Sequence, residues 1–289
     1  MHKSRLTAVG LSAGIKLSTI NVAEANKPGM ECSNRSLLGT YMYAFVGFYE
    51  DAAGKRLLYQ SVGIEYFDGQ GKVRISHANS LGNSPGDYET FEADYQIDAN
   101  CVGRIEYDEG APDRIFVDPK GGHFTWIDTN EGAFKTSRDD RTSLLKPGHC
   151  SLATLKGTYS YSLFGSGNKA SFLADLFAEA GLESFDGAGH LLNKYRDSDG
   201  VEEVVAGSYQ INADCSGTAT YGSGSDARTY QIFVGPSGQD MAFIDREVDF
   251  IKFGKESRIS QGMLVQPQPS LNDDRAALNW QGVAGPGKK

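Results

Sequence analysis

Two glutamates, Glu65 and Glu183, are the residues of this sequence whose placement most clearly allows acid–base chemistry. Each stands two positions before a phenylalanine, Phe67 or Phe185, near the end of a segment that is typical of a β-strand. Because side chains along a strand alternate between its two faces, each glutamate shares a face with its phenylalanine. On a buried face, desolvation would raise the pKa of the carboxyl toward that of a general acid or base. Alternatively, each glutamate is structural and hydrogen-bonds a neighbouring tyrosine or arginine.

Aromatic side chains on the same predicted faces are candidates for contact with an apolar or planar ligand. They are Tyr41, Tyr43 and Trp126 in the first half of the chain and Tyr159, Tyr161 and Tyr195 in the second, together with His77. Tyrosine and tryptophan combine a large apolar surface with a polar group, which suits them both to ligand contact and to simple core packing. For His77, a satisfied core histidine is the alternative to a role in binding.

The sequence predicts neither a metal site nor a cofactor. Its five histidines do not cluster along the chain, and it has no Cys-x2-Cys pair. The run Asp197-Ser198-Asp199-Gly200 resembles part of a calcium loop, but Tyr195 occupies the first ligand position. A His-Glu-x2-His pair and a dinucleotide-binding Gly-x-Gly-x2-Gly fingerprint are both absent. A net charge of -9 argues against nucleic acid or an anionic membrane surface as a partner.

The candidate residues recur because the sequence contains two copies of one domain. Three phrases return in the same order: Gly-Thr-Tyr at 39–41 and 157–159, Phe-Asp-Gly-x-Gly at 67–71 and 185–189, and Tyr-Gln-Ile-x3-Cys-x-Gly at 95–103 and 209–217. The offset between the copies changes only from 118 at the first cysteine of each copy to 114 at the second. Such an offset allows loop-sized insertions only, and each repeat is far longer than a solenoid unit. We therefore expect complete domains at 32–143 and 150–260, joined by a short linker at 144–149 that brings them into contact.

Each copy is predicted to be an all-β, closed, eight-stranded antiparallel barrel of the calycin-like kind. The chain has 11% aromatic residues and 35 glycines, which favour strands separated by turns. The expected strands are 38–47, 57–67, 71–80, 88–98, 102–108, 113–118, 122–129 and 132–138 in the first copy, and 156–165, 171–185, 189–198, 202–212, 216–222, 228–234, 239–246 and 248–255 in the second. Short turns rich in glycine indicate hairpins, and closure removes the exposed edges of an open meander. A β-sandwich is the alternative.

The two ends of the chain differ in composition from the repeats. Residues 1–25 combine a basic start, a short apolar stretch and an Ala-Glu-Ala cleavage pattern, which predicts a secretory signal peptide. Lys16 interrupts the apolar stretch, so a disordered leader is the alternative. Residues 26–31 are then a linker, and the polar residues 261–289, rich in proline and glycine, are predicted to form a disordered tail. No segment approaches the ~18 apolar residues of a membrane span, and we expect a secreted or periplasmic protein.

The four cysteines fall at equivalent places, two in each copy. Of the possible connectivities, independently folding repeats predict the pairs Cys32–Cys101 and Cys150–Cys215. Each disulfide would close a loop of about 65 to 70 residues and stabilise the fold by roughly 4 kcal/mol in the chain-entropy model. Paired cysteines also favour an oxidising compartment, in agreement with the predicted leader.

The three repeated phrases resemble those of exported bacterial proteins of mostly unassigned function. The resemblance covers residues 32–260 and implies a barrel similar to that of allene oxide cyclase-like or lipocalin-like proteins. It implies either a carrier of a small apolar or aromatic molecule or an enzyme that cyclises or isomerises a confined substrate. No positions match the catalytic residues of such enzymes, so none is carried over.

Three hypotheses about function follow. The first is an exported binding protein that holds a small apolar or aromatic molecule in one or both barrels. An isomerase or cyclase is the second, and a structural or interaction module with filled barrels is the third. Neither the identity of the ligand nor the oligomeric state follows from the sequence. Because the copies share their scaffold, we expect a specific function where their interiors differ. The differing positions are His77 and Tyr195, Trp126 and Phe243, and Ile75 and Asn193.

Overall fold

The computed structural model describes residues 31–50, 53–80, 88–166, 176–245 and 251–264. The predicted signal peptide at 1–25 lies outside the described residues, as do nearly all of the predicted linker at 26–31 and most of the predicted tail at 261–289.

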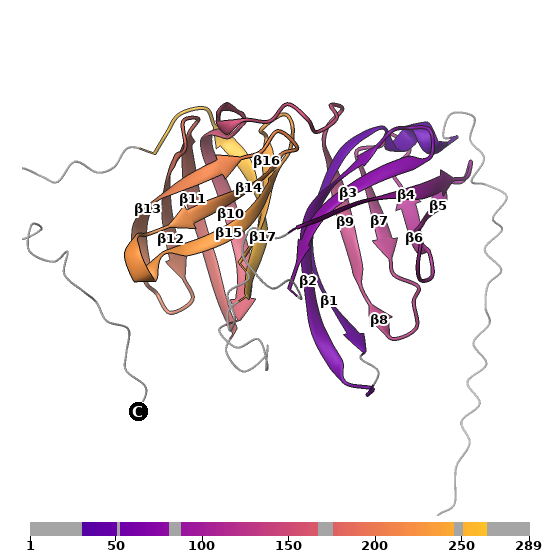
Figure 1. The fold of residues 1–289 in the computed structure, drawn as a ribbon, viewed down its shortest axis with the longest axis horizontal. Coiled ribbons are helices and arrows are strands. Elements are labelled where there is room, and N and C mark those ends of the chain that lie inside the picture. Colours follow the sequence, from indigo (N-terminus) through magenta and orange to yellow (C-terminus); the bar gives the residue numbers. More distant parts are fainter. Residues whose placement is uncertain (1–30, 51–52, 81–87, 167–175, 246–250, 265–289) are drawn as a thin grey trace, which may run out of the picture.

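Two closed antiparallel β-barrels follow one another along the chain (Figure 1). The first contains β1 (Gly39–Glu50), β2 (Arg56–Phe67), β3 (Lys72–Asn79), β4 (Glu89–Ile97), β5 (Val102–Glu106), β6 (Asp113–Val117), β7 (His123–Ile127), β8 (Ala133–Phe134) and β9 (Thr136–Ser143). The second contains β10 (Lys156–Ser166), β11 (Leu176–Asp186), β12 (His190–Asp197), β13 (Glu202–Ile211), β14 (Ser216–Tyr221), β15 (Arg228–Val234), β16 (Asp240–Asp245) and β17 (Ile251–Ser260). Each barrel closes because its first strand pairs with both its second and its last strand. The predicted eight-stranded barrels are confirmed, and the short β8 is an addition that pairs with β1.

The repeated Phe-Asp-Gly phrase forms the turn between the second and third strands of each barrel. Asp68 Oδ1 accepts hydrogen bonds from three backbone N–H groups that follow it, at distances from 2.7 to 3.0 Å. Asp186 Oδ1 accepts two such bonds in the second barrel, at 2.7 and 3.0 Å. The glycine after each aspartate has a φ of +75° or +80°, which a residue with a side chain adopts only at a cost. The phrase therefore recurs because the turn needs both residues.

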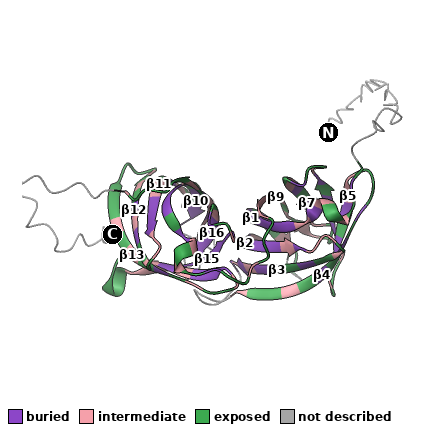
Figure 2. Cartoon of the chain, turned by 90° about the horizontal axis from the view of Figure 1, so that it is seen from above, coloured by how far each residue is buried: buried purple, intermediate pink, exposed green. Residues whose placement is uncertain are grey.

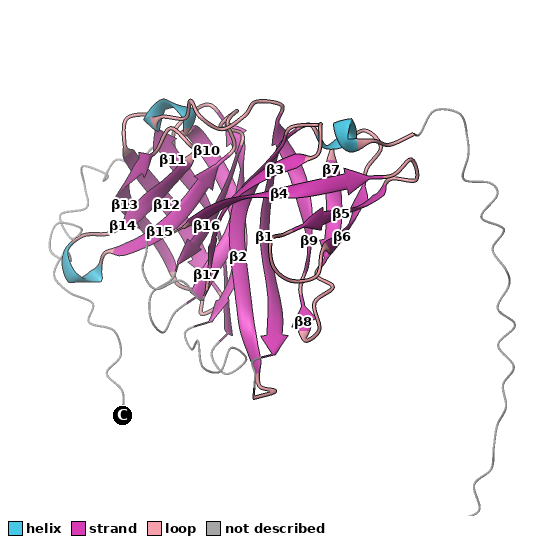
Figure 3. Cartoon of the chain, turned by 45° about the vertical axis from the view of Figure 1, so that its right-hand side comes forward, coloured by secondary structure: helices cyan, strands magenta, loops and turns pink. Residues whose placement is uncertain are grey.

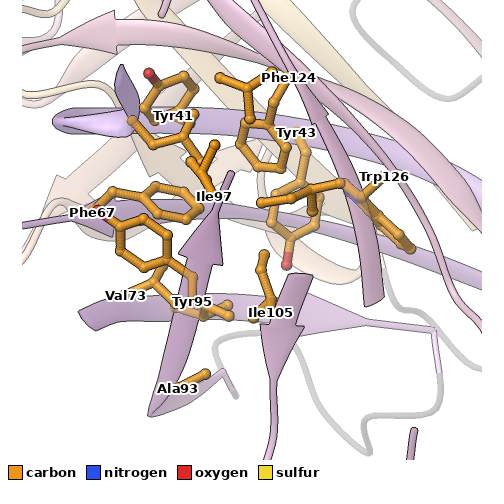
Figure 4. Packing of buried hydrophobic residues seen from close by; sticks show 14 of the residues in the cluster. Tyr41, Tyr43, Phe67, Val73, Ala93, Tyr95, Ile97, Ile105, Phe124 and Trp126 are labelled. Atoms are coloured by element: carbon orange, nitrogen blue, oxygen red, sulfur yellow. The ribbon is translucent and has the colours of Figure 1, made fainter. Parts of the chain in front are cut away.

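One end of each barrel is packed shut around a buried tyrosine, and Figure 4 shows this cluster in the first barrel. The Tyr41 hydroxyl donates to the backbone carbonyl of Gly121 at 2.7 Å. Its ring meets those of Phe67 and Phe124 edge to face, with centroids 5.4 and 5.3 Å away. Such edge-to-face contacts stabilise aromatic cores beyond the burial of their area. The equivalent tyrosine of the second barrel, Tyr159, is also fully buried.

A disulfide joins the two cysteines of each repeat, Cys32 to Cys101 and Cys150 to Cys215. This is the pairing that the duplication predicts. Each bond connects the segment before a short 3-10 helix, η2 (Asn34–Leu37) or η3 (Leu152–Thr154), to the turn that follows the fourth strand of its barrel. The disulfides thus fasten the packed ends of the barrels.

The closing strand of each barrel lies further along the chain than the sequence predicts. The predicted strands 132–138 and 248–255 overlap the observed ones, but their ends at 138 and 255 are wrong, because β9 ends at Ser143 and β17 ends at Ser260. Residues 248–250 lie outside the described residues. Their last six residues are Arg-Asp-Asp-Arg-Thr-Ser and Lys-Glu-Ser-Arg-Ile-Ser, which show no clear apolar alternation. These segments are extended because pairing with the first strand of the barrel satisfies their backbone N–H and C=O groups.

The two barrels pack side by side through the outer faces of β1 and β2 and those of β15, β16 and β17 (Figures 2 and 3). The shared core contains Met42, Val62 and Ile64 of the first barrel and Phe233, Ala242 and Ile244 of the second. Polar contacts flank this core: the Tyr88 hydroxyl donates to Asp214 at 2.7 Å, and Lys255 Nζ pairs with Asp140 at 3.1 Å. The contact between the two domains that we expected from the short linker is therefore a buried apolar interface between the barrels.

We expect Phe233→Ala to weaken the interface between the barrels. Phe233 is fully buried, and its ring centroid lies 5.9 Å from that of Tyr88 in the other barrel. Its truncation leaves a cavity and should lower the free energy of unfolding by about 3 to 5 kcal/mol. Urea unfolding followed by circular dichroism should show an earlier or divided transition.

Phe116 supplies the matched control, because it holds the equivalent position of the first barrel and is 48% exposed. Phe116→Ala should change the free energy of unfolding by less than about 1 kcal/mol. Equal effects of the two substitutions would contradict the described interface.

Candidate functional site

The second barrel contains a cavity of about 500 Å³ at the end opposite the packed Tyr159. All eight strands of the barrel contribute to its wall. Aromatic rings form much of this wall, namely those of Tyr161, Phe177, Tyr195, Tyr221, Tyr230 and Phe243. The volume falls within the range of about 300 to 1,000 Å³ that is typical of pockets for small molecules.

A pair of buried carboxyls, Glu183 and Glu256, lies on this wall. They come from β11 and β17, the two strands that flank β10, where Tyr159 is opposite Glu183 and Tyr161 is opposite Glu256. Both side chains are almost completely buried, with exposures of 1% and 2%. One oxygen of each carboxyl, Oε1 of Glu183 and Oε2 of Glu256, has no hydrogen-bond partner among the described residues.

The environment keeps this pair protonated to a higher pH than ordinary glutamates. Desolvation by burial raises the pKa of Glu183 to about 7, while hydrogen bonds from Glu256 and Tyr221 oppose that increase. Burial also raises the pKa of Glu256 well above its ordinary value, and the charge of Glu183 adds to this effect. Two carboxyls this close cannot both ionise readily, so the pair holds a shared proton around neutral pH.

The rings around the carboxyl pair support one another. Tyr221 and Tyr230 meet at 4.9 Å between centroids, and Tyr230 meets Phe243 at 6.0 Å. Tyr161 contacts Phe243 from the other side at 6.1 Å. All three contacts are edge to face, which is a favourable geometry for aromatic rings. Each of these rings that lines the cavity is therefore packed against at least one other.

An ion pair lies in the same cavity, closer to the end of β10. Lys252 Nζ contacts Glu179, and its ammonium also lies 5.6 Å from the ring centroids of Phe177 and Tyr195. The Tyr161 hydroxyl donates to Glu179 Oε1 at 2.6 Å and accepts a hydrogen bond from Asn193 at 2.9 Å. The carboxylate of Glu179 therefore already pairs with an ammonium group, whereas each carboxyl of the deeper pair keeps one oxygen without a hydrogen-bond partner among the described residues.

The first barrel holds a smaller cavity, of about 210 Å³. It contains a corresponding acidic group: Glu65 lines the cavity, and Asp139 occupies the position of Glu256 on the closing strand. Desolvation raises the pKa of Asp139 to about 7 and that of Glu65 well above its ordinary value. Asp113 also lines this cavity, with a pKa raised by burial to about 6 and a hydrogen bond from Tyr107 at 2.7 Å.

Larger side chains explain the smaller volume of the first cavity. Phe45 and Trp126 meet edge to face at 4.9 Å in the first barrel, where the second barrel has Leu163 and Phe243. Trp126 Nε1 also donates to Asp139 Oδ1 at 3.3 Å. The indole of Trp126 thus lies against the carboxyl of Asp139. In the second barrel, Phe243 replaces the indole, and the equivalent carboxyl of Glu256 lines the larger cavity.

Most of the residues predicted from the sequence lie on one of the two cavities. Tyr43, Glu65, His77 and Trp126 line the first, and Tyr161, Glu183 and Tyr195 line the second. Burial lowers the pKa of His77, whose Nε2 is 3.4 Å from Glu89 Oε2. Tyr195 donates its hydroxyl to Glu203 at 2.9 Å.

Tyr41 and Tyr159 are placed differently from the other candidates. The structure puts them in the packed ends of the barrels, where their hydroxyls donate to the backbone carbonyls of Gly121 and Gly238. Both side chains are fully buried among other core residues. We therefore assign them to the core rather than to a ligand site.

Sequence reasoning missed the second member of each acidic group, Asp139 and Glu256. Both lie in the closing strands, and the predicted strands 132–138 and 248–255 each end one residue before them. A signal exists in the duplication: each acidic residue follows a basic residue and stands two positions before the arginine of an Arg-x-Ser phrase. Aligning the copies through that phrase would have placed the two carboxyls at equivalent inward positions.

Among the described residues, no group of three or more His, Cys, Asp or Glu side chains is arranged to hold a metal ion. No helix in the described ranges is long and apolar enough to cross a membrane.

No family model and no curated protein matches the chain. Among solved structures, the chain is similar to a protein of unknown function from the DUF3598 family of Nostoc punctiforme. The two share 10% sequence identity with a TM-score of 0.26, over 80% of this chain and 100% of the other. Similarity at that level supports no conclusion about function.

The buried carboxyl pair predicts an unusual dependence of stability on pH. The folded state holds a proton on Glu183 up to a pH of about 7, whereas the ordinary pKa of glutamate is 4.5. The unfolded chain releases that proton first, so the free energy of unfolding should fall as pH rises from about 5 to about 7. Asp186 acts in the opposite direction, since backbone hydrogen bonds overcome desolvation and lower its pKa to about 2. Its contribution is lost only below about pH 4, outside this window.

Glu183→Gln should therefore stabilise the protein at pH 8 by an amount on the order of 3 kcal/mol, and should have little effect at pH 4.5. Urea unfolding at the two pH values measures the difference. Glu92→Gln, at an exposed position of β4, is the control and should behave like the unmodified protein. A stabilisation that is equal at both pH values would contradict the assigned proton.

Proposed function

We propose that this chain is an exported binding protein that holds a small aromatic molecule in the second barrel. One observation carries the proposal: a cavity of about 500 Å³ has walls of mutually packed aromatic rings and a buried carboxyl pair with unpartnered oxygens. Pockets for small molecules combine an apolar or aromatic lining with a few fixed polar groups in the same way. A planar molecule would stack on the rings and be oriented by the carboxyls.

Export is supported by the two disulfides and by the predicted signal peptide at 1–25. Structural disulfides persist in oxidising compartments and are rare in the cytosol. Within this proposal the domains are the repeats 32–143 and 150–260, and the first repeat is chiefly a scaffold. Its smaller cavity and the contact of Phe45 with Trp126 leave less space for a ligand.

Native mass spectrometry of protein purified from its source should reveal a bound molecule of low mass. The variant Leu163→Phe/Phe243→Trp introduces into the second cavity the two larger side chains that narrow the first, and it should remove that molecule. It should also weaken binding of the neutral planar dye Nile red by more than about tenfold, because the added rings occupy the cavity. Fluorescence titration measures the change.

The control is Trp126→Phe, which alters the first barrel alone and should leave Nile red binding unchanged. The absence of both a bound molecule and dye binding in the unmodified protein would overturn the proposed function. Dye binding that survives the double substitution would place the site elsewhere.

An isomerase that moves a proton within a confined substrate is a second candidate. It is favoured by the pKa of Glu183, which burial raises to about 7, so that the carboxyl is able to exchange a proton near neutral pH. Glu183 would accept a proton from one carbon of the substrate, exchange it with solvent, and deliver a proton to another carbon. Incubation of the bound molecule with the protein in D2O would show deuterium at carbon if this occurs, and Glu183→Gln would abolish it. Retention of all carbon-bound hydrogens would exclude this candidate.

A further inference from the structure

We infer that the second cavity selects organic cations, with an ammonium group beside Glu183 and Glu256 and a planar body against the surrounding rings. This inference rests on the proposed binding function and specifies its ligand class. Charge, unpaired polar atoms and aromatic geometry support it separately.

The charges on the wall of the cavity are predominantly negative. Seven acidic side chains line it, namely Glu179, Glu183, Asp197, Asp199, Glu203, Asp226 and Glu256, against two basic ones, Arg228 and Lys252. Both basic groups already face carboxylates, Lys252 at Glu179 and Arg228 at Asp245, the latter at 3.7 Å. A confined site lined by one sign of charge attracts ligands of the other sign and repels those of its own. The cavity should therefore exclude carboxylates and phosphates.

The unpaired oxygens of the two glutamates indicate where the positive group of a ligand belongs. Oε1 of Glu183 and Oε2 of Glu256 are buried without hydrogen-bond partners among the described residues. A buried polar atom without a partner costs about 1 to 3 kcal/mol, and more when it carries charge. An ammonium group supplies several N–H donors and a compensating charge at once. Hydrogen bonds between ionised partners are also about twice as strong as neutral ones.

The rings of Tyr161, Tyr221, Tyr230 and Phe243 complete the site on the same wall. Aromatic faces attract cations, most strongly where water is excluded. The protein already uses this combination for its own ammonium groups. Lys252 Nζ lies against Glu179 and near two rings, and Lys135 Nζ in the first barrel pairs with Asp128 at 2.9 Å while lying 4.8 Å from the Tyr59 ring. The carboxyl pair of Glu183 and Glu256 is likewise surrounded by aromatic rings, but no basic side chain of the described residues forms an ion pair with it.

Binding of a cation should release the shared proton of the carboxyl pair to solvent. The ammonium replaces that proton as the partner of the carboxylates, so acid competes with the ligand. The titratable and charged groups that face the pair are Tyr159 and Tyr161 on β10, Glu179 on β11, Tyr221 on β14, Tyr230 on β15 and Lys252 on β17. The tyrosines are held neutral by burial, which raises the pKa of each. Glu179 and Lys252 offset each other, which leaves the carboxyl pair to set the dependence on pH.

Isothermal titration of the full exported chain with matched probes tests this inference. Each probe set has one planar body carrying an amine, an alcohol or a carboxylate: tryptamine, tryptophol and indole-3-propionate, and the corresponding phenyl and naphthyl compounds. At pH 8, the amine of at least one set should bind more than about tenfold tighter than its alcohol, and the carboxylate should bind weakest. The affinity of that amine should fall by up to about tenfold for each unit of pH below 7, because one proton competes with it.

The variant Glu183→Gln/Glu256→Gln should abolish the preference for the amine and its dependence on pH while preserving binding of the alcohol and of Nile red. Retained dye binding shows that the variant is folded with an open cavity. Glu65→Gln, the equivalent change in the first barrel, should leave the preference intact.

The possible results separate this inference from the proposed function. If no amine binds tighter than its alcohol while Nile red or a neutral probe binds, the cation selectivity is overturned and the binding function stands. If no probe, dye or bound natural molecule is found, both are overturned. A preference for the amine that survives the double substitution would also overturn the role of the carboxyl pair.

Discussion

The closure of each barrel by its first and last strands is the constraint on which the rest of the structure depends. β1 pairs with β9, and β10 pairs with β17, so every principal strand has two hydrogen-bonded neighbours. Closure removes exposed sheet edges and creates an interior that water reaches only from the end. It also brings inward side chains of the second and last strands to either side of the first. Glu183 and Glu256 meet for this reason, although they are far apart in the sequence.

The buried carboxyls are costly, and the two barrels reduce that cost in different ways. Desolvation disfavours the charged form, so each acidic group holds protons to a higher pH than it would in water. In the first barrel, the indole of Trp126 donates to Asp139 and fills the adjacent space. In the second, Phe243 has no such donor, and the pair lies beside a larger cavity. A duplicated scaffold thus carries the same acidic arrangement beside a smaller cavity in the first barrel and beside a larger one in the second.

Much of the fold follows from local signals in the sequence. Short stretches of chain determine the turns at Asp68 and Asp186, the cysteine pairs and the alternation around Glu65 and Glu183. Each of these signals occurs in both copies of the repeat, which strengthens the prediction. The closing strands could not be predicted in the same way. Asp139 and Glu256 lie in polar runs without apolar alternation, and only pairing with β1 or β10 makes those runs extended. Tyr41 and Tyr159 had the expected strand phase, but phase does not say at which end of a barrel a side chain lies.

The sequence by itself determined the duplication, the all-β class, the turns and the pairing of cysteines, because these depend on residue type, periodicity and equivalence between copies. Tertiary structure alone decided that the outer faces of β1 and β2 are buried against β15, β16 and β17, so that Phe233 is core while its equivalent Phe116 is exposed. It also decided which interior has the larger cavity. Cavity volume depends on how side chains from all eight strands of a barrel pack across its interior. No single stretch of sequence therefore determines that volume.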